Sequence, residues 1–600
     1  MNLLEELRSL FAPVLAESIP DRADLSATLA MIKPTVDPKH GDYQANFAMG
    51  LAKKLGRKPQ EIAADIVARI PANPIVDALT VAGPGFINIR LKDSWIAERT
   101  RIMAGDERLG VAPTVVPRTL VVDYCGPNVA KPLHVGHLRS TIIGEALIRI
   151  LRFAGHTVVG DNHLGDWGTQ FGILLYGYKH LVDKTAYAAD PVAELARIYV
   201  EVRNLTKVDE DDDGNKPNLT AEQKAVVDAY RRETVRLHNG DAENIALWNE
   251  FMPHCMKEIH DVFDRLDVHP DFELGESFYH PMLPGIVEDL MSKGIAEESQ
   301  GAIIVRGDND RVSLIRKSDG AFTYTTTDLA TIRYRLDRWN PDALIYVVDF
   351  RQGDHFRNLF DAARRWSESA VELSHVSFGS VLGEDGKPLK TRDGGVVELH
   401  SLLNQAIAEG ERTYEASGIE RIGLGREVPD FTPEERRNIA RIVGIGAVKY
   451  ADLSQNRTSD YKFSFEKMLS TDGNTAAYMQ YAYARARAIL RKGEIDGATL
   501  RVNPPAVVLI EPEERALALQ LLRFSQAIDD AIRDYSPHVL TGYLWDVAKP
   551  MSSFYASKKC KVLLDDNNEL RESRLVLIDL TGRVIQKALK LLGIDTIEQM

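Results

Sequence analysis

Two histidines lie just after a turn that follows an apolar run. The motif reads His134-Val-Gly136-His137, and Lys131 precedes it by three residues. His134 and His137 are spaced i, i+3, so on a helix they share one face. Imidazole donors at a helix N-terminus could stabilise charge on a pentavalent α-phosphate, and Gly136 would let a planar group such as adenine approach the backbone. The alternative is a pair of satisfied surface histidines at a helix start.

The surrounding pattern is that of a β-α-β unit. TLVVDYC (119–125) reads as a buried strand, 134–154 as a helix, and 156–166 as the next strand with its exit loop. Later, DALIYVVDF (342–350) and SHVSFGSVLG (374–383) read as further buried strands with a helix between them. This alternation predicts an α/β domain with a doubly wound, Rossmann-type parallel sheet. The motif itself matches neither GxxxxGK[ST] nor GxGxxG.

The pattern along the chain divides it into four segments. Residues 1–112 read as a small α+β domain. The parallel-sheet domain covers 113–400, with a mostly helical insertion at about 182–320. Residues 401–451 read as a connecting helical segment, and 452–600 as an all-α bundle.

Composition indicates an ordinary soluble protein. Apolar content of 44% and charged content of 27% are typical of globular chains, and the net charge of −14 argues weakly against nonspecific nucleic-acid binding. No apolar run is long enough for a transmembrane helix, so no membrane partner is expected. The N-terminal stretch carries acids early and has amphipathic helical spacing, unlike a signal peptide. We therefore expect a cytoplasmic protein.

The cysteines and one acidic block carry little chemistry. Cys125, Cys255 and Cys560 lie far apart, so neither a disulfide framework nor a zinc site is expected. The block VDEDDDGNKP (208–217) is interpreted as a solvated loop. A calcium loop is disfavoured because Thr220 stands where its final glutamate belongs.

Several motifs in order carry a resemblance to a known family. DYCGPNVAKPLHVGHLRSTIIG (123–144), followed by NHLGDWGTQFG, closely resembles the arginyl-tRNA synthetases, which are class I aminoacyl-tRNA ligases. HGDYQANFAM (40–49) is similar to the family's N-terminal tRNA-binding module, and AVKYADLSQNRTSDY (447–461) to the approach to its anticodon-binding bundle. The resemblance implies that L-arginine and ATP, accompanied by Mg²⁺ and without zinc, give arginyl-adenylate and pyrophosphate. The arginyl group then passes to the 3′-terminal adenosine of tRNA(Arg).

The resemblance assigns the ATP chemistry residue by residue. ATP would bind at His134, Gly136, His137 and Lys390, and the histidines would stabilise the transition state without acting as general bases. The second class I signature, KMSKS, is incomplete in GKPLKTRDGG, where Lys387 and Lys390 occupy its lysine positions. In many family members the lysine matching Lys131 is thought to compensate. Without the first motif, the same loop would read as a solvated hairpin turn.

Recognition of arginine demands acids, because a guanidinium offers five donors in a planar fork. Tyr324 and Asp328 are spaced i, i+4 near a predicted helix start, and Asp123 falls in an apolar strand, where an acid needs a partner. Asp328 as a helix cap and Tyr324 as a core residue are the plain alternatives. The arginine-binding residues implied by the resemblance are Asp123, Asn128, Glu276, Tyr324, Asp328 and Gln352.

Basic and aromatic residues interleave in NTAAYMQYAYARARAILRK (474–492), a pattern that suits backbone contact and base stacking. Tyrosines packed in the bundle core are an equally plain reading. The full set of candidate tRNA-binding residues is Asp42, Gln44, Asn46, Tyr478, Tyr481, Arg485 and Trp545.

Three other functions remain open from the residues alone. One is a different class I synthetase, of glutaminyl or cysteinyl type, although zinc ligands for the latter are absent. Another is a small nucleotidyltransferase, which would not need the C-terminal bundle. The third is a degenerate RNA-binding protein, which would have lost the histidine pair or the acids. A monomer is expected at the level of the family.

Overall fold

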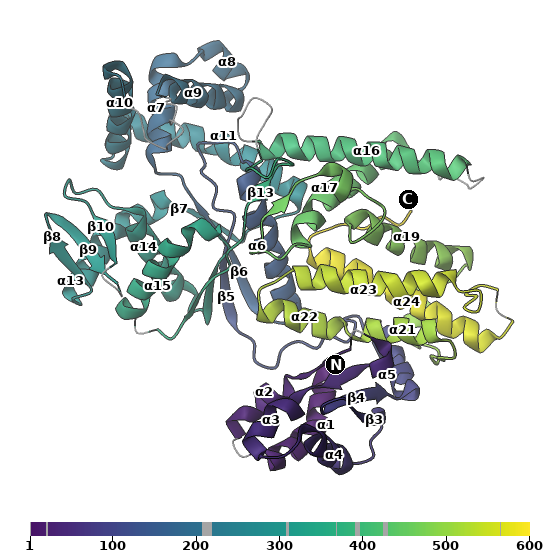
Figure 1. Cartoon of the computed structure of the whole chain (residues 1–600). Coiled ribbons are helices and arrows are strands. Elements are labelled where there is room, and N and C mark those ends of the chain that lie inside the picture. The colour runs from purple at the N-terminus through teal and green to yellow at the C-terminus, as the bar shows by residue number, and fades with distance from the viewer. Residues whose placement is uncertain are drawn as a thin grey trace.

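The structure, a computed structural model, describes most of the chain. The described residues are 2–19, 22–35, 37–206, 219–307, 311–367, 369–389, 397–423, 430–564 and 566–599. The acidic block at 208–217 and Lys390 lie outside them. Figure 1 shows an N-terminal module, a central sheet with its helices, and a C-terminal helical bundle. Among the described residues, no helix is long and apolar enough to cross a membrane.

The N-terminal module packs helices on a four-stranded antiparallel sheet, as the predicted α+β unit requires. Its sheet order is β1-β2-β4-β3. The strands are β1 (Ile32–Pro34), β2 (Tyr43–Ala45), β3 (Val76–Ala82) and β4 (Phe86–Leu91), and the helices are α1 (Leu3–Ser18), α2 (Leu25–Leu29), α3 (Phe47–Leu55), α4 (Pro59–Arg69) and α5 (Asp93–Gly105). Phe11, Tyr43 and Phe47 are fully buried and form its core.

The central module is built on a five-stranded, all-parallel sheet, which confirms the doubly wound prediction. The strand order is β12-β11-β5-β6-β7. The strands are β5 (Thr119–Asp123), β6 (Thr157–Leu164), β7 (Phe272–Gly275), β11 (Ala343–Tyr346) and β12 (Glu372–His375), and the helices that connect or follow them include α6 (Val135–Phe153), α14 (Tyr324–Trp339) and α15 (Gly353–Trp366). The chain leaves β5 toward β6 and later returns to β11 on its other side. The crevice at the carboxyl ends of β5 and β11 is therefore the topological switch point, where such sheets bind ligands.

A helical hairpin region and a small sheet interrupt this order. The helices are α7 (Thr169–Leu181), α8 (Lys184–Ala189), α9 (Pro191–Leu205), α10 (Ala221–His238) and α11 (Ala242–Leu266), followed after β7 by α12 (Glu276–Tyr279), α13 (Leu283–Ser292) and the antiparallel strands β8 (Ala296–Ser299), β9 (Ala302–Arg306) and β10 (Val312–Arg316). The range read as a mostly helical insertion, 182–320, thus contains β7, an edge strand of the main sheet. FELG is short and carries a glutamate, so no apolar run marked it as a strand.

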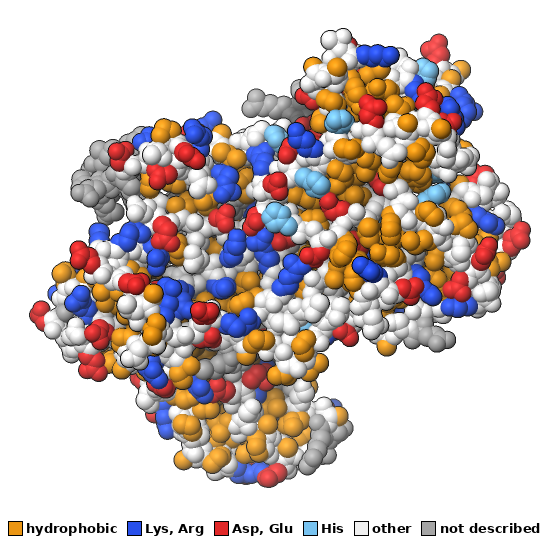
Figure 2. All heavy atoms as spheres, turned by 180° about the vertical axis from the view of Figure 1, so that it is seen from behind, with side chains coloured by type: hydrophobic (Ala, Val, Ile, Leu, Met, Phe, Trp, Pro, Cys, Tyr) orange, Lys and Arg blue, Asp and Glu red, His pale blue; other side chains and the backbone are white. Residues whose placement is uncertain are grey.

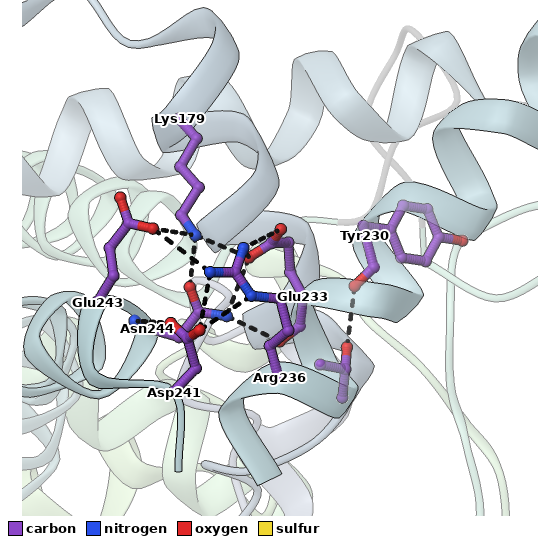
Figure 3. A network of polar contacts seen from close by, with 8 residues as sticks. Lys179, Tyr230, Glu233, Arg236, Asp241, Glu243 and Asn244 are labelled. Carbon is purple, nitrogen blue, oxygen red and sulfur yellow. Dashed lines mark hydrogen bonds and ion pairs between the residues drawn. The ribbon is translucent and has the colours of Figure 1, made fainter. Parts of the chain in front are cut away.

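A polar network joins α7, α10 and α11 (Figure 3). Lys179 Nζ lies 2.8 Å from Glu233 Oε2 and 2.5 Å from Asn244 Oδ1, and Arg236 Nη2 lies 2.8 Å from Asp241 Oδ2. Burial alone would raise the pKa of Glu233, but hydrogen bonds from Lys179 and Asn244 outweigh it and hold the pKa below its usual value. The network satisfies its own donors and acceptors and fixes the packing of three helices.

The C-terminal region is helical, as predicted. Its elements are α16 (Leu399–Gly423), α17 (Pro433–Leu453), α18 (Phe465–Met468), α19 (Ala476–Lys492), α20 (Gly497–Val502), α21 (Pro512–Leu522), α22 (Phe524–Arg533), α23 (His538–Ala556) and α24 (Asn568–Leu591). A two-stranded parallel pair, β13 (Val381–Leu382) with β14 (Tyr461–Lys462), links it to the central module. One continuous apolar cluster runs from Leu7 through Leu138 to Leu577, so the modules share a core.

Candidate functional site

The histidine pair begins α6, which leaves the switch point of the sheet. His134 is the N-cap, and its Nδ1 accepts the backbone N–H of Gly136 at 3.1 Å. His137 Nδ1 accepts the N–H of His134, also at 3.1 Å, and the ring centroids lie 4.0 Å apart. A side chain at position 136 would approach the His134 ring to 2.8 Å, which explains the glycine.

These hydrogen bonds determine the tautomer of both neutral rings. Because each Nδ1 accepts a backbone hydrogen, each neutral ring carries its proton on Nε2. Burial lowers the pKa of His134. The pKa of His137 is lowered to about 3, mainly by burial and to a smaller extent by the neighbouring His134. The motif therefore presents two neutral Nε2–H donors at a helix N-terminus. That chemistry suits a developing negative charge better than proton abstraction.

Two of the three lysines predicted to assist, Lys131 and Lys387, lie in the described part of the chain. Lys131 Nζ lies 5.7 Å from the ring centroid of Tyr199 on α9, and burial, with Arg203 nearby, lowers its pKa. Lys387 is exposed in the turn after β13. Lys390 lies outside the described residues. The structure thus leaves the three lysine roles as predictions.

Arg139, within the quoted motif but given no role from the sequence, joins the histidine helix to the segments that precede β13 and β14. It is 1% exposed, and its Nη1 donates to Gly379 O at 2.8 Å and Ser459 O at 3.0 Å. Gly379 and Ser459 lie shortly before the paired strands β13 and β14. Arg139 also pairs with buried Asp452, with Nε 3.1 Å from Oδ2. The histidine helix and the segments before β13 and β14 are therefore held together through one guanidinium.

Asp123 ends β5 and is already paired inside the protein. Arg335 from α14 is fully buried; its Nη2 lies 2.6 Å from Asp123 Oδ2, and its Nε lies 2.8 Å from Asp161 Oδ2 on β6. Burial raises the pKa of Asp123, and Arg335 opposes that rise. Neither Arg335 nor Asp161 was identified from the sequence, because α14 and β6 are far from Asp123 along the chain.

Tyr324 and Asp328 lie on the first turns of α14, as their spacing predicted. Asp328 Oδ2 is 2.6 Å from His355 Nε2, and the rings of Tyr324 and His355 are 4.8 Å apart. Tyr324 is 66% exposed, which disfavours the core alternative for that side chain. Gln352 is exposed on the turn that leads into α15, the helix that carries His355. His355 was missed, although it lies only three residues after Gln352.

Asn128 and Glu276 lie around the loop that follows β6. Asn128 forms a bridge with Gly165, and its Oδ1 is buried without a hydrogen-bond partner. Burial raises the pKa of Glu276, which also interacts with His163, Asp166 and Asp328. The three acidic candidates, Asp123, Glu276 and Asp328, thus lie at the carboxyl edge of the sheet, and Asp166 is an addition that the sequence did not single out.

The bundle candidates form one aromatic and basic surface on α19 and α23. The rings of Tyr478 and Trp545 are 5.4 Å apart, and the Arg485 guanidinium lies 4.5 Å from the Tyr481 ring and 4.9 Å from that of Tyr555. We call Tyr478, Tyr481, Arg485, Trp545 and Tyr555 the bundle surface. Tyr555 was missed because it lies outside the segment with interleaved arginines and tyrosines.

The N-terminal candidates have different surroundings. Asp42 is 6% exposed and its carboxylate is held by Arg515 of the bundle. Gln44 Nε2 donates to Asn88 Oδ1 at 2.7 Å across β2 and β4. Asn46, at the start of α3, has a buried Oδ1 without a hydrogen-bond partner.

Comparison with known proteins gives consistent matches along the chain. Residues 5–91 match the arginyl tRNA synthetase N-terminal domain, 100–465 the class I (R) tRNA synthetase catalytic domain, and 479–600 the DALR anticodon-binding domain. An arginine–tRNA ligase of Rhodopirellula baltica is 42% identical over 681 residues, covering 100% of both chains. The crystal structure of arginyl-tRNA synthetase from Plasmodium falciparum has a TM-score of 0.82 at 28% identity, covering 99% of each chain. That of Thermus thermophilus has a TM-score of 0.81 at 25% identity, covering 99% of this chain and 100% of its own.

Proposed function

The chain belongs to the arginyl-tRNA synthetase family, and we propose that it activates L-arginine with ATP and transfers the arginyl group to tRNA(Arg). One observation supports this most directly. Two neutral imidazoles begin α6 at the switch point of the sheet, and the acids Glu276 and Asp328 interact at the same edge. A phosphate site beside an acidic pocket is what joining a nucleotide to a cationic amino acid requires.

In the first step, a carboxylate oxygen of arginine attacks the α-phosphorus of ATP. The bond from that phosphorus to the bridging oxygen breaks, and pyrophosphate leaves with the electron pair. His134 and His137 donate Nε2–H to the charge that builds on the α-phosphate. We propose that Gly136 lies against the adenine and that Lys131, Lys387 and Lys390 supply positive charge to the departing pyrophosphate.

ATP would enter with Mg²⁺ on its phosphates as part of the substrate. Among the described residues, no group of three or more His, Cys, Asp or Glu side chains could hold a metal ion.

The arginine pocket would use charge and shape together. We propose that Asp328 and Tyr324 receive the guanidinium, that Gln352, Asn128 and the internally paired Asp123 orient the α-amino end, and that Glu276 adds a second acidic contact. A lysine substrate would leave buried acceptors unpaired, a loss that can reach roughly 10⁴-fold in kcat/KM.

In the second step, a hydroxyl of the 3′-terminal ribose attacks the arginyl carbonyl, and AMP leaves. We propose that the bundle surface stacks on anticodon bases, and that Gln44 and Asn46 contact another part of the tRNA.

We also propose that the chain consists of four domains, at residues 1–112, 113–400, 401–451 and 452–600. We propose that the protein is a monomer and is located in the cytoplasm.

Pyrophosphate–ATP exchange tests this function. Exchange would be measured with arginine, lysine, glutamine and cysteine, each with and without total tRNA. We expect exchange with arginine alone, and only when tRNA is added. Exchange with another amino acid would refute the acidic pocket. Tight tRNA binding without any exchange would leave an RNA-binding protein as the better reading.

A further inference from the structure

The N-terminal module meets the bundle along α5, with further contacts from Asn2 to Asp529 and from Arg523 to Asp42 O. Figure 1 shows α5 against the bundle, beside α21. It packs on α20, α21 and α24. Cavities of about 960 and 840 Å³ lie near its two ends, lined in part by Asp93 and Gly105 respectively. An apolar core shared with the bundle holds the middle of α5, and polar groups at its two ends add directed contacts beside these clefts.

At the first end, Arg515 of α21 binds two carboxylates of the N-terminal module. Its Nη1 and Nη2 lie 2.8 and 2.9 Å from the two oxygens of Asp42, and its Nε lies 2.5 Å from Asp93 Oδ1. Nη2 also donates to Leu91 O at 3.1 Å. Asp42 Oδ2 in turn accepts the N–H of Leu91 at 2.7 Å, so the guanidinium is tied to the end of the inner strand β4.

At the second end, Arg583 of α24 binds main-chain oxygens. Its Nη1 donates to Ala104 O at 2.5 Å, and its Nη2 to Asp106 O at 2.7 Å. These carbonyls are at the C-terminus of α5, where the helix dipole favours a cation. Two arginines of the bundle thus hold α5 at points separated by about 20 Å of helix.

Arg515 is poorly placed to contact RNA itself. Its side chain is 14% exposed, and its five N–H groups make four hydrogen bonds within the protein. Arg515 instead connects the two candidate RNA surfaces. Asp42 directly precedes β2, which carries Gln44, and α21 packs on α23, which carries Trp545.

We propose that Arg515 and Arg583 are positioning residues: they clamp α5 so that the N-terminal module and the bundle surface are preset at the separation one tRNA needs. The proposal rests on the proposed function. In this proposal Asp42 does not contact the tRNA; its carboxylate binds Arg515 and so helps to position the N-terminal module. If loss of the clamp leaves about one molecule in ten competent at any time, the KM for tRNA rises about tenfold, because apparent affinity falls with the competent fraction.

The test compares R515Q, R583Q and the double variant with R101Q. Arg101 is on α5 too, but it pairs with Glu98 on the same helix, so R101Q is a matched control. Steady-state charging gives kcat and the KM for full-length tRNA. Fluorescence anisotropy gives the Kd of an isolated anticodon stem-loop, which reaches only the bundle. Tryptic cleavage of the segment 106–118 reports undocking of the N-terminal module without any RNA.

We expect the double variant to show faster cleavage and a KM for tRNA raised about tenfold, with kcat and the stem-loop Kd within about twofold of wild type. Faster cleavage with an unchanged KM would overturn the proposal, as would a stem-loop Kd that rises in parallel with KM. R515K keeps the positive charge but loses the planar guanidinium. Its KM for tRNA should lie between those of wild type and R515Q, which would show that R515Q does not act simply by misfolding. A wild-type enzyme that charges no tRNA would instead refute the proposed function.

Discussion

The guanidinium of Arg335 lies 2.6 Å from the carboxylate of Asp123, with both groups in the interior of the sheet module. The same guanidinium binds Asp161 on the neighbouring strand. Arg335 belongs to α14, whose first turns carry Tyr324 and Asp328. One buried cation therefore pairs with an acid on each of two neighbouring strands and sets the position of the helix that would receive the substrate.

Replacing Arg335 with glutamine should destabilise the protein strongly. Two buried carboxylates would lose their cation, and breaking such a pair costs about 3–5 kcal/mol. Thermal unfolding should show a large fall in Tm, whereas R333Q, at an exposed position of the same helix that pairs with Asp337, should shift it little. Equal shifts for the two variants would mean that the buried triad adds no stability.

Replacing Asp328 with asparagine should weaken arginine recognition selectively. The change removes the charge and keeps the size, and a hydrogen bond to a charged group is worth about 1.5–3 kcal/mol. We expect kcat/KM for arginine to fall about 10- to 100-fold, with the KM for ATP nearly unchanged. D337N, on the exposed side of α14, is the control. A larger effect on ATP than on arginine would contradict the assignment.

Replacing His137 with asparagine should reduce kcat about 10²- to 10³-fold, the usual effect of losing one such donor. Asparagine can reproduce the Nδ1 acceptor that caps His134 N–H, but it lacks the Nε2 donor. Glutamine, which can place a donor near the Nε2 position, should recover part of the rate. Single-turnover adenylate formation would measure both variants. Full activity of H137N would show that the imidazole makes no contact with the reacting phosphate.

His137 should leave no inflection in the rate between pH 6 and 8. Burial, followed by the neighbouring His134, lowers the pKa of His137 to about 3. The His137 ring therefore remains neutral as the pH falls through the usual histidine range, and its donor is unchanged. The pH dependence of single-turnover adenylate formation should be the same for wild type and H137Q. An inflection near pH 6.5 that H137Q abolishes would contradict this.

Lys449 should make stability rise with pH above neutrality. Burial lowers its pKa to about 7, and its amine donates to Leu266 O at the end of α11. The unfolded chain, with an ordinary lysine pKa of 10.5, binds more protons between pH 7 and 10.5, so folding becomes more favourable across that window. The full effect is up to roughly 4–5 kcal/mol.

The K449M variant lacks this titration. The Tm of K449M minus that of wild type should therefore be highest at pH 7 and fall steadily toward pH 9. For K492M, at an exposed position of α19, the Tm difference from wild type should not change with pH. Parallel Tm profiles for wild type and K449M would mean that Lys449 stays charged in the folded protein.

Local patterns predicted the elements that carry the chemistry. The apolar run at 119–125 and the long periodicity after His134 gave β5 and α6, and the i, i+4 spacing of Tyr324 and Asp328 placed both on one helix. The pattern failed at β7, where four residues form an edge strand without an apolar run. Its hydrogen bonds to β6 exist only once the sheet has formed.

By itself, the sequence determined the types of chemistry, the doubly wound sheet and the family resemblance, because these depend on residues close together along the chain. Only the tertiary structure decided which charges meet. Asp123 and Arg335 are 212 residues apart, and Asp42 and Arg515 are 473 apart. Burial makes each of these ion pairs important for stability, because a carboxylate removed from water is costly unless a cation lies beside it. Only the folded chain brings that cation next to the carboxylate.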